Sequence, residues 1–223
     1  MRVLPIERIP EALWKSNLLR LPVLLSTAYV SHLDRLGIKH LSTDSTSKDV
    51  HGGKSTEETH DHFARRFTVS SGRIEFSTLG PSSGFEPLSE AFLSTFSDGH
   101  IGLLDIPCGT GAMSGALVST LVKLREDRIL PRLPLTITVC AGDFSAEALH
   151  IFDLLMRDLA PPASAQGITL VWHVLEWDAT RGDHTARLID RWFAACPTAN
   201  EYFVVVSNFS AALHNQSAFA AFS

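Results

Sequence analysis

Four apolar runs alternate with helix-like segments from Ile101 onward, and this alternation constrains the fold more than any other feature. The runs have the length and β-branched content of strands, whereas the segments between them repeat apolar residues with the period of a helix. The runs are GLLDI (102–106), LTITVCAG (135–142), ITLVWHVL (168–175) and EYFVVVS (201–207). The helix-like segments are GALVSTLVKLRED (115–127), AEALHIFDLLMRDL (146–159) and HTARLIDRWFAA (184–195). This order predicts an α/β fold, a Rossmann-like doubly wound parallel sheet with helices on both faces.

The part of the chain before the alternation has a different pattern. Residues 1–97 predict a mostly helical N-terminal extension, and residues 98–223 predict the sheet-containing portion. Residues 5–37 are expected to form two helices, the second beginning at Pro22 and ending at Gly37, because proline is favoured at the start of a helix and glycine just after its end.

A polar stretch interrupts the extension. Residues 42–58 are rich in Ser, Thr and Gly, which predicts a flexible linker, with a lid that orders only on binding as the alternative. Ser55 followed by Glu58 has the spacing of a capping box, so a helix is expected to begin there. The next segment, FTVSSGRIEFSTL (67–79), alternates loosely around a Ser-Gly pair. It predicts a hairpin, with one more helix as the alternative.

Charge and composition give no indication of two kinds of partner, a nucleic acid and a membrane surface. The 223 residues carry a formal net charge of -5, and 45% are hydrophobic and 19% charged, as in an ordinary globular protein. The net charge therefore gives no indication of a nucleic-acid partner or of an anionic membrane surface. The N-terminal segment has charges and prolines where a secretion signal needs an unbroken apolar stretch. The most apolar early segment, LLRLPVLLSTAYV (18–30), is interrupted by Arg20 and Pro22 and is too short to span a bilayer.

The cysteines and histidines predict neither disulfides nor a metal site. Three cysteines, Cys108, Cys140 and Cys196, are an odd number without metal-binding spacing, which favours a reducing compartment and a cytoplasmic location. His60 and His62 point to different faces of the expected helix, so no metal is predicted there or with His51.

A glycine-rich turn follows the first strand-like run, where a doubly wound sheet binds its ligand. Gly109 and Gly111 allow a tight turn, but no lysine follows before Lys123, which excludes a phosphate-binding P-loop. With Gly115 the turn approximates a dinucleotide fingerprint. Asp105, at the end of the strand, would repel a pyrophosphate and instead suits a cationic amino group. The residues therefore favour an amino-acid-bearing nucleoside.

The segment DIPCGTG resembles the first motif of class I S-adenosylmethionine-dependent methyltransferases, with Pro107 where many members have glycine. The resemblance implies that S-adenosyl-L-methionine is bound by residues of this motif. These are Asp105, Pro107, Cys108, Gly109, Thr110 and Gly111.

Two later segments follow the family's order. AGDFSAEAL resembles the segment whose acidic residue accepts hydrogen bonds from the ribose hydroxyls, which implies that role for Asp143, with Phe144 and Ser145 beside it. A helix cap is the alternative for Asp143. LEWDAT resembles the segment that meets adenine, which implies that Asp178 binds the adenine amino group and that Trp177 and Ala179 flank the ring. A core position is the alternative for Trp177.

The segment SNFSAAL lies where amino-directed methyltransferases carry Asn/Asp-Pro-Pro-aromatic. Ser207 and Asn208 are the expected cofactor-site residues here, and only Asn208 matches that signature, so an amino acceptor is not supported. In the family, methyl transfer is an in-line displacement that depends on orientation and a desolvated pocket, so no catalytic residue can be assigned. The resemblance implies a methyltransferase with an unknown acceptor. A non-catalytic cofactor-binding scaffold and an NAD(P)-dependent oxidoreductase are the alternatives.

The last run is expected to lie at an edge of the sheet. The family's sheet continues beyond the four strands that can be placed here, so residues 202–207 would form an apolar edge without lysine or proline. We therefore expect a second polypeptide, a downstream segment missing from this chain or a homodimer partner to cover this edge.

Overall fold

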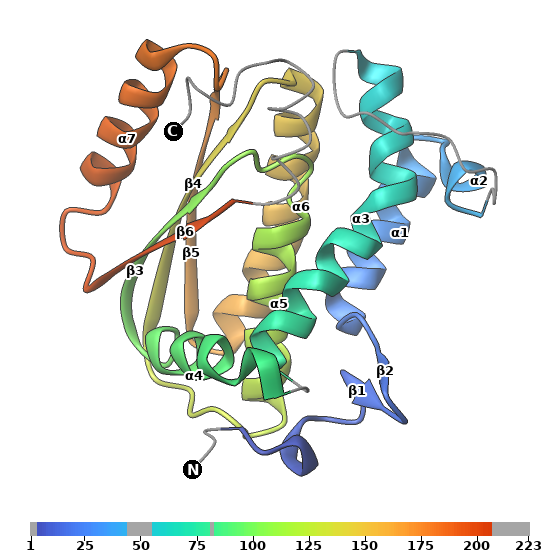
Figure 1. The fold of residues 1–223 in the computed structure, drawn as a ribbon. Helices are drawn as coiled ribbons and strands as arrows, with labels where there is room; N and C mark the ends of the chain where they lie inside the picture. Colours follow the sequence, from blue (N-terminus) through green and yellow to red (C-terminus); the bar gives the residue numbers. More distant parts are fainter. Residues whose placement is uncertain (1–3, 44–54, 81–82, 207–223) are drawn as a thin grey trace.

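A four-stranded parallel sheet lies at the centre of the fold (Figure 1). The computed structural model of the chain describes residues 4–43, 55–80 and 83–206. The strands of the sheet are β3 (Gly99–Asp105), β4 (Leu135–Asp143), β5 (Ile168–Glu176) and β6 (Glu201–Val205). Their order is β5-β4-β3-β6, and every neighbouring pair is parallel. The predicted α/β parallel sheet is confirmed, and this order is compatible with a Rossmann-like fold.

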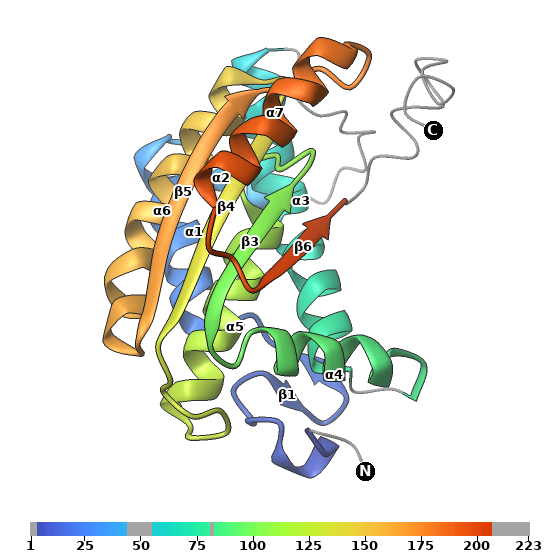
Figure 2. The same ribbon diagram turned by 90° about the vertical axis from the view of Figure 1, so that its left-hand side faces the viewer.

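The helices after the strands cover both faces of the sheet. Helices α5 (Ala112–Glu126) and α6 (Ala146–Ala165) lie on one face, and α7 (Gly182–Ala195) lies on the other (Figures 1 and 2). The chain moves in one direction from β3 to β5 and then returns past β3 to β6. Because crossovers between parallel strands are right-handed, this reversal places α7 on the opposite face. The reversal lies between β3 and β6, at the switch point where such sheets bind ligands.

The beginning of the chain differs from the expected pair of helices. The first predicted helix is wrong, because residues 5–19 form a 3-10 turn and a small antiparallel hairpin. These elements are η1 (Ile6–Arg8), β1 (Trp14–Lys15) and β2 (Leu18–Leu19). Ser16 and Asn17 both have positive φ, which makes a tight turn between the strands. The second helix is confirmed as α1 (Val23–Arg35), which follows Pro22, and Gly37 lies just past its end with φ 70°. The short helix α2 (Lys39–Ser42) comes next.

The segment predicted as a hairpin is the second half of a long helix, so that prediction is wrong and its helical alternative is correct. Helix α3 (Thr56–Leu79) has 24 residues and ends at Gly80, which has φ 56°. The expected cap is confirmed, because the Ser55 hydroxyl accepts a hydrogen bond from the Glu58 N–H at 3.1 Å. Of the predicted linker, residues 44–54 lie outside the described residues. The elements η2 (Ser83–Phe85) and α4 (Glu86–Thr95) complete this part.

Helices α1 and α3 join the core of the sheet domain through an aromatic cluster. Tyr29 stacks on Phe67 with ring centroids 5.0 Å apart, and Phe63 meets both rings edge-on. The Tyr29 hydroxyl donates a hydrogen bond to the carbonyl oxygen of Ala64 at 2.5 Å. Each such ring pair adds about 0.5–1.5 kcal/mol to the burial of its surface. These rings belong to the same buried cluster as the sheet-facing side chains, so the extension and the sheet share one core.

A buried arginine, Arg125, links the loops at the amino ends of three strands. The Arg125 guanidinium donates hydrogen bonds to the carbonyl oxygens of Leu133, Gln166 and Ser97 at 2.7, 2.9 and 2.8 Å. These acceptors precede β4, β5 and β3. One side chain therefore joins three connections that are distant in sequence.

The side chain of Glu75 in α3 is an acid buried in the core. Glu75 is fully buried, and neither of its carboxylate oxygens has a hydrogen-bond partner among the described residues. Burial raises the pKa of Glu75 to about 9. The folded chain therefore keeps this proton at neutral pH, whereas the unfolded chain loses it near the ordinary value of 4.5.

This difference makes stability depend on pH. Between these two pKa values the folded state binds more protons than the unfolded state, so the free energy of unfolding falls as pH rises. We expect Glu75→Gln to remove this loss and to raise the melting temperature relative to the parent more at about pH 8 than at about pH 5. Thermal unfolding of the variant and the parent at both pH values measures this difference in melting temperature, with the exposed Glu126→Gln as control. An equal effect of Glu75→Gln at both pH values would contradict the assignment.

Candidate functional site

The glycine turn joins the end of β3 to the start of α5. It follows Asp105 through a cis peptide bond between Ile106 and Pro107. Gly109 and Gly111 have φ values of 52° and 89°, in the left-handed region that favours glycine. The turn thus has the geometry that the sequence predicts, at the carboxyl end of β3 and beside the switch point.

Asp105 presents a buried carboxyl group to this turn. One oxygen, Oδ2, accepts a hydrogen bond from the Ser114 hydroxyl at 2.6 Å, and Oδ1 has no partner in the described part of the chain. Burial raises the pKa of Asp105 to about 7, against the lowering effect of Ser114, and the nearby charge of Asp143 also raises it. A buried polar atom without a partner is rare in folded proteins, so Oδ1 marks a place where a hydrogen-bond donor or a cation is expected.

Asp143 joins the turn after β3 to the turn after β4. Its Oδ2 accepts a hydrogen bond from the Gly109 N–H, and its Oδ1 accepts one from the Ser145 N–H, each at 2.9 Å. Burial raises the pKa of Asp143, and these N–H groups partly oppose the shift. The cap of α6 is Ser145, whose hydroxyl accepts from the Ala148 N–H at 3.2 Å. Asp143 therefore bridges two turns, and its carboxylate retains acceptor capacity for a ligand hydroxyl.

The two glycines of the turn have different surroundings. A Cβ added at Gly109 would meet nothing within 4 Å, so this backbone borders open space. A Cβ at Gly111 would lie 3.0 Å from Phe152 and 3.1 Å from Leu155, so Gly111 lets α5 pack closely on α6. Gly115 does the same against Leu25 and Leu155. Within the turn, ligand approach is open at Gly109.

The remaining residues of the first motif are mostly buried. Thr110 and Cys108 are buried, and Pro107 is partly exposed. Burial, followed by the charges of Asp143 and Asp105, raises the pKa of the Cys108 thiol well above its ordinary value. The thiol therefore stays protonated, as expected of a packing residue rather than a nucleophile.

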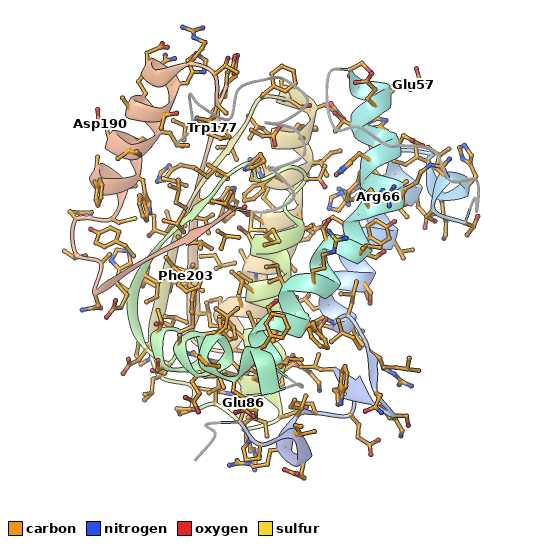
Figure 3. All side chains as sticks on the ribbon, viewed as in Figure 1. Glu57, Arg66, Glu86, Trp177, Asp190 and Phe203 are labelled. Carbon is orange, nitrogen blue, oxygen red and sulfur yellow. The ribbon has the colours of Figure 1, made fainter. Side chains whose placement is uncertain are left out.

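The segment after β5 is divided between the core and the surface. Trp177 is buried beneath α7 with Leu188, and its indole N–H donates to the Thr185 hydroxyl at 3.1 Å, a placement that fits its core alternative (Figure 3). Asp178 is half-buried, and its Oδ1 accepts from the N–H and hydroxyl of Thr180 at 2.9 and 2.7 Å. Both hydrogen bonds lower the pKa of Asp178, and the bond from the Thr180 hydroxyl has the larger effect. Ala179 packs partly against the cluster beneath α7.

The other predicted site residues differ in exposure. Phe144 follows Asp143 directly and is 52% exposed, so its ring is accessible beside the carboxylate. Ser207 and Asn208 lie outside the described residues.

Helix α3 borders the site, and its Thr59 is a residue that the sequence did not single out. The Thr59 hydroxyl lies 2.9 Å from the Ser145 hydroxyl, and His60 Nε2 lies 2.7 Å from a Glu147 carboxylate oxygen. Further along α3, the Ser71 hydroxyl donates to the carbonyl oxygen of Ala112 at 3.2 Å. The extension therefore contacts the first turns of both α6 and α5. Ser114 is a second residue that the sequence did not single out, since its hydrogen bond to Asp105 is recognisable only in the folded structure.

The described residues contain no cluster of three His, Cys, Asp or Glu side chains that could hold a metal ion. His60 pairs with Glu147 instead, and Arg65 pairs with Asp61 at 2.6 Å. None of the helices in the described ranges has both the length and the apolar character needed to cross a bilayer. No protein-family model matches this sequence, and no curated protein sequence matches it.

The contrast between the two glycines predicts different effects of one added methyl group. Gly111→Ala should lower the free energy of unfolding by about 1–3 kcal/mol or more, because it combines positive φ with overpacking against Phe152. Gly109→Ala has the same backbone strain without the clash, so it should cost less. Urea unfolding of both variants measures the difference. A Gly109→Ala variant as unstable as Gly111→Ala would contradict the open space at Gly109.

Proposed function

We propose that this chain binds S-adenosyl-L-methionine at the carboxyl ends of β3 and β4 and positions it for methyl transfer to an acceptor that the residues do not identify. The observation that carries the proposal is Asp105 Oδ1, a buried carboxylate oxygen without a partner among the described residues, beside a glycine turn. A cationic amino group is the ligand that best satisfies such an atom.

The arrangement around Asp105 fits the other parts of this cofactor. Asp143 has acceptor capacity left for a ribose hydroxyl, because its two oxygens offer about four lone-pair sites and three backbone N–H groups, those of Gly109, Phe144 and Ser145, bond to the carboxylate. The exposed ring of Phe144 offers an apolar face for adenine next to that carboxylate. Gly109 borders open space, which leaves room for a ligand at the turn, beside the Asp143 carboxylate that its N–H bonds.

The chain's contribution to the reaction would be binding and orientation. The bound cofactor supplies an activated methyl group, so the residues need not form a covalent intermediate. Asp105 would hold the amino group, and Asp143 would hold the ribose. With both ends fixed, the methyl group points in one direction, and a correctly placed acceptor reacts without losing further rotational freedom.

The carboxyl group of Asp105 argues against a nicotinamide dinucleotide. Asp105 ends β3 directly before the glycine turn, and an acidic group there repels the pyrophosphate that the dinucleotide fold normally binds at this place.

A comparison of ligands by thermal shift tests the proposed class. S-adenosylhomocysteine should raise the melting temperature, since a ligand at a hundred times its dissociation constant adds about 2.7 kcal/mol to the stability of the folded state. NAD(H) and NADP(H) should leave it unchanged. Stabilisation by the nucleotides alone would overturn the proposal in favour of an oxidoreductase. If S-adenosylmethionine binds but no methyl group reaches any acceptor pool, the non-catalytic scaffold would replace the transferase.

The proposed contact of Asp105 predicts a pH-dependent affinity. Because the pKa of Asp105 is raised to about 7, the carboxyl is neutral below that pH and charged above it. The affinity for S-adenosylhomocysteine should therefore fall as pH drops from about 8 to about 6. Asp105→Asn should weaken binding by about 1.5–3 kcal/mol at the higher pH and remove the pH dependence.

Isothermal titration calorimetry at several pH values measures this effect. The exposed Asp190→Asn on α7 is the matched control, since it makes the same chemical change far from the turn (Figure 3). Asp105→Asn with the affinity and pH profile of the parent would show that Asp105 does not contact the ligand.

A further inference from the structure

Strand β6 forms one edge of the sheet and pairs on one side only. Five residue pairs join it to β3, from Ile101 with Glu201 to Asp105 with Val205. No second strand pairs with it among the described residues, and Figure 2 shows β6 at one margin of the sheet. Within the described ranges, the N–H and C=O groups along the other side of the strand therefore have no strand partner, and such an edge can pair with another strand.

The two faces of β6 differ in how they are covered. Phe203 points to the core face, where its ring centroid lies 5.4 Å from that of Phe96, and Val205 is buried on the same face. On the α7 face, Tyr202, Val204 and Val206 are 43%, 51% and 50% exposed. Strands of a parallel sheet are normally buried on both faces, whereas the described part of the chain leaves these apolar side chains about half exposed.

The exposed surface continues from β6 onto α7. Phe193 is 50% exposed, and its ring centroid lies 5.2 Å from that of Tyr202. Together with Val204 and Val206 these residues make one apolar surface, which we call the β6 patch. Contiguous apolar patches of this kind mark interaction sites more often than scattered apolar residues do.

The opposite edge strand, β5, is less suited to pairing. It carries Thr169, His173 and Glu176, polar residues of the kind that proteins place on exposed edges. Strand β6 carries one charge, Glu201, at its start, and its other four residues are apolar or aromatic. The two edges therefore differ in their protection against an added strand.

An acidic groove adjoins the beginning of β6. It has a volume of about 550 Å³ and is lined by the end of α4, the Asp98–Gly99 turn and the first residues of β6. Among the described residues that line it, Asp98 and Glu201 are the two charged ones, both exposed, and none is a lysine or arginine. Asn200 also lines the groove, and its side-chain oxygen accepts a hydrogen bond from the His100 N–H at 2.7 Å.

We infer that β6 is a docking site for an extended apolar segment of another polypeptide, which adds a strand to the sheet and places a lysine or arginine in the acidic groove. The free edge would supply main-chain hydrogen bonds, the β6 patch would receive alternate side chains, and Asp98 and Glu201 would select the charge at one end. A second copy of this chain fits less well, because residues 199–206 contain no basic residue to meet the groove.

Binding of designed peptides by fluorescence anisotropy tests this inference with the full chain. The probes are labelled peptides of alternating valine and threonine, with a pair of arginines at either the first or the last positions. We expect one of the two to bind, and the position of its arginines reports the strand direction. Glutamates in place of the arginines should weaken binding about tenfold, and a central proline should abolish it, since proline removes a ladder donor.

Two variants locate the site. Val204→Lys should abolish binding because a lysine on an edge strand discourages pairing, whereas the matched change Val171→Lys on β5 should leave binding unchanged. The double variant Asp98→Lys with Glu201→Lys should reverse the preference from arginine to glutamate peptides. Binding that ignores all these changes, or no binding by any peptide, would overturn the inference.

Two further outcomes would assign the edge to another occupant and so also overturn it. Concentration-dependent dimers in sedimentation experiments, lost in Val204→Lys, would identify a second copy. Protection of every β6 amide from hydrogen exchange in the peptide-free monomer would show that the chain covers its own edge. The unpaired edge should instead leave alternate amides exchanging.

Discussion

The bridge made by Asp143 is the interaction on which the candidate site depends. Its two oxygens hold the N–H groups of Gly109 and Ser145, and these belong to turns that follow different strands. Hydrogen bonds to a charged acceptor are stronger than neutral ones, and breaking them here would leave a mostly buried carboxylate without partners. The bridge therefore sets the separation between the glycine turn and the start of α6. The open side of Gly109 and the exposed ring of Phe144 both take their positions from it.

Much of the sheet could be predicted because its signal is local and repeated. Apolar runs such as residues 201–207 show strand character over several residues, and the helical segments between them repeat their own period. The hairpin at residues 14–19 could not be predicted, since two-residue strands have no period and depend on the positive φ of Ser16 and Asn17. The segment around Glu75 alternated enough to suggest a strand. It instead continues helix α3, in which the buried residues Phe67, Ser71, Glu75 and Leu79 recur every four positions.

The position of the candidate site in the chain could be predicted, but the contacts that its individual residues make could not. The order of Asp105, the glycines and Asp143 along the chain identifies the turns after β3 and β4. Whether Gly111 faces a ligand or Phe152 depends on how α5 crosses α6, which involves residues far apart in sequence. The contact between Thr59 and Ser145 spans 86 positions and has no local signature.

Arg125 has a consequence for how the chain reaches its folded state. Its three carbonyl acceptors come from connections 28, 8 and 41 positions away along the chain, so its hydrogen bonds can form only after several βα units have come together. Until then its charge must remain hydrated, because a guanidinium without partners is costly to bury. The amino end of the sheet therefore dehydrates as a late and cooperative event. Contacts of such long sequence separation slow the search for the native topology.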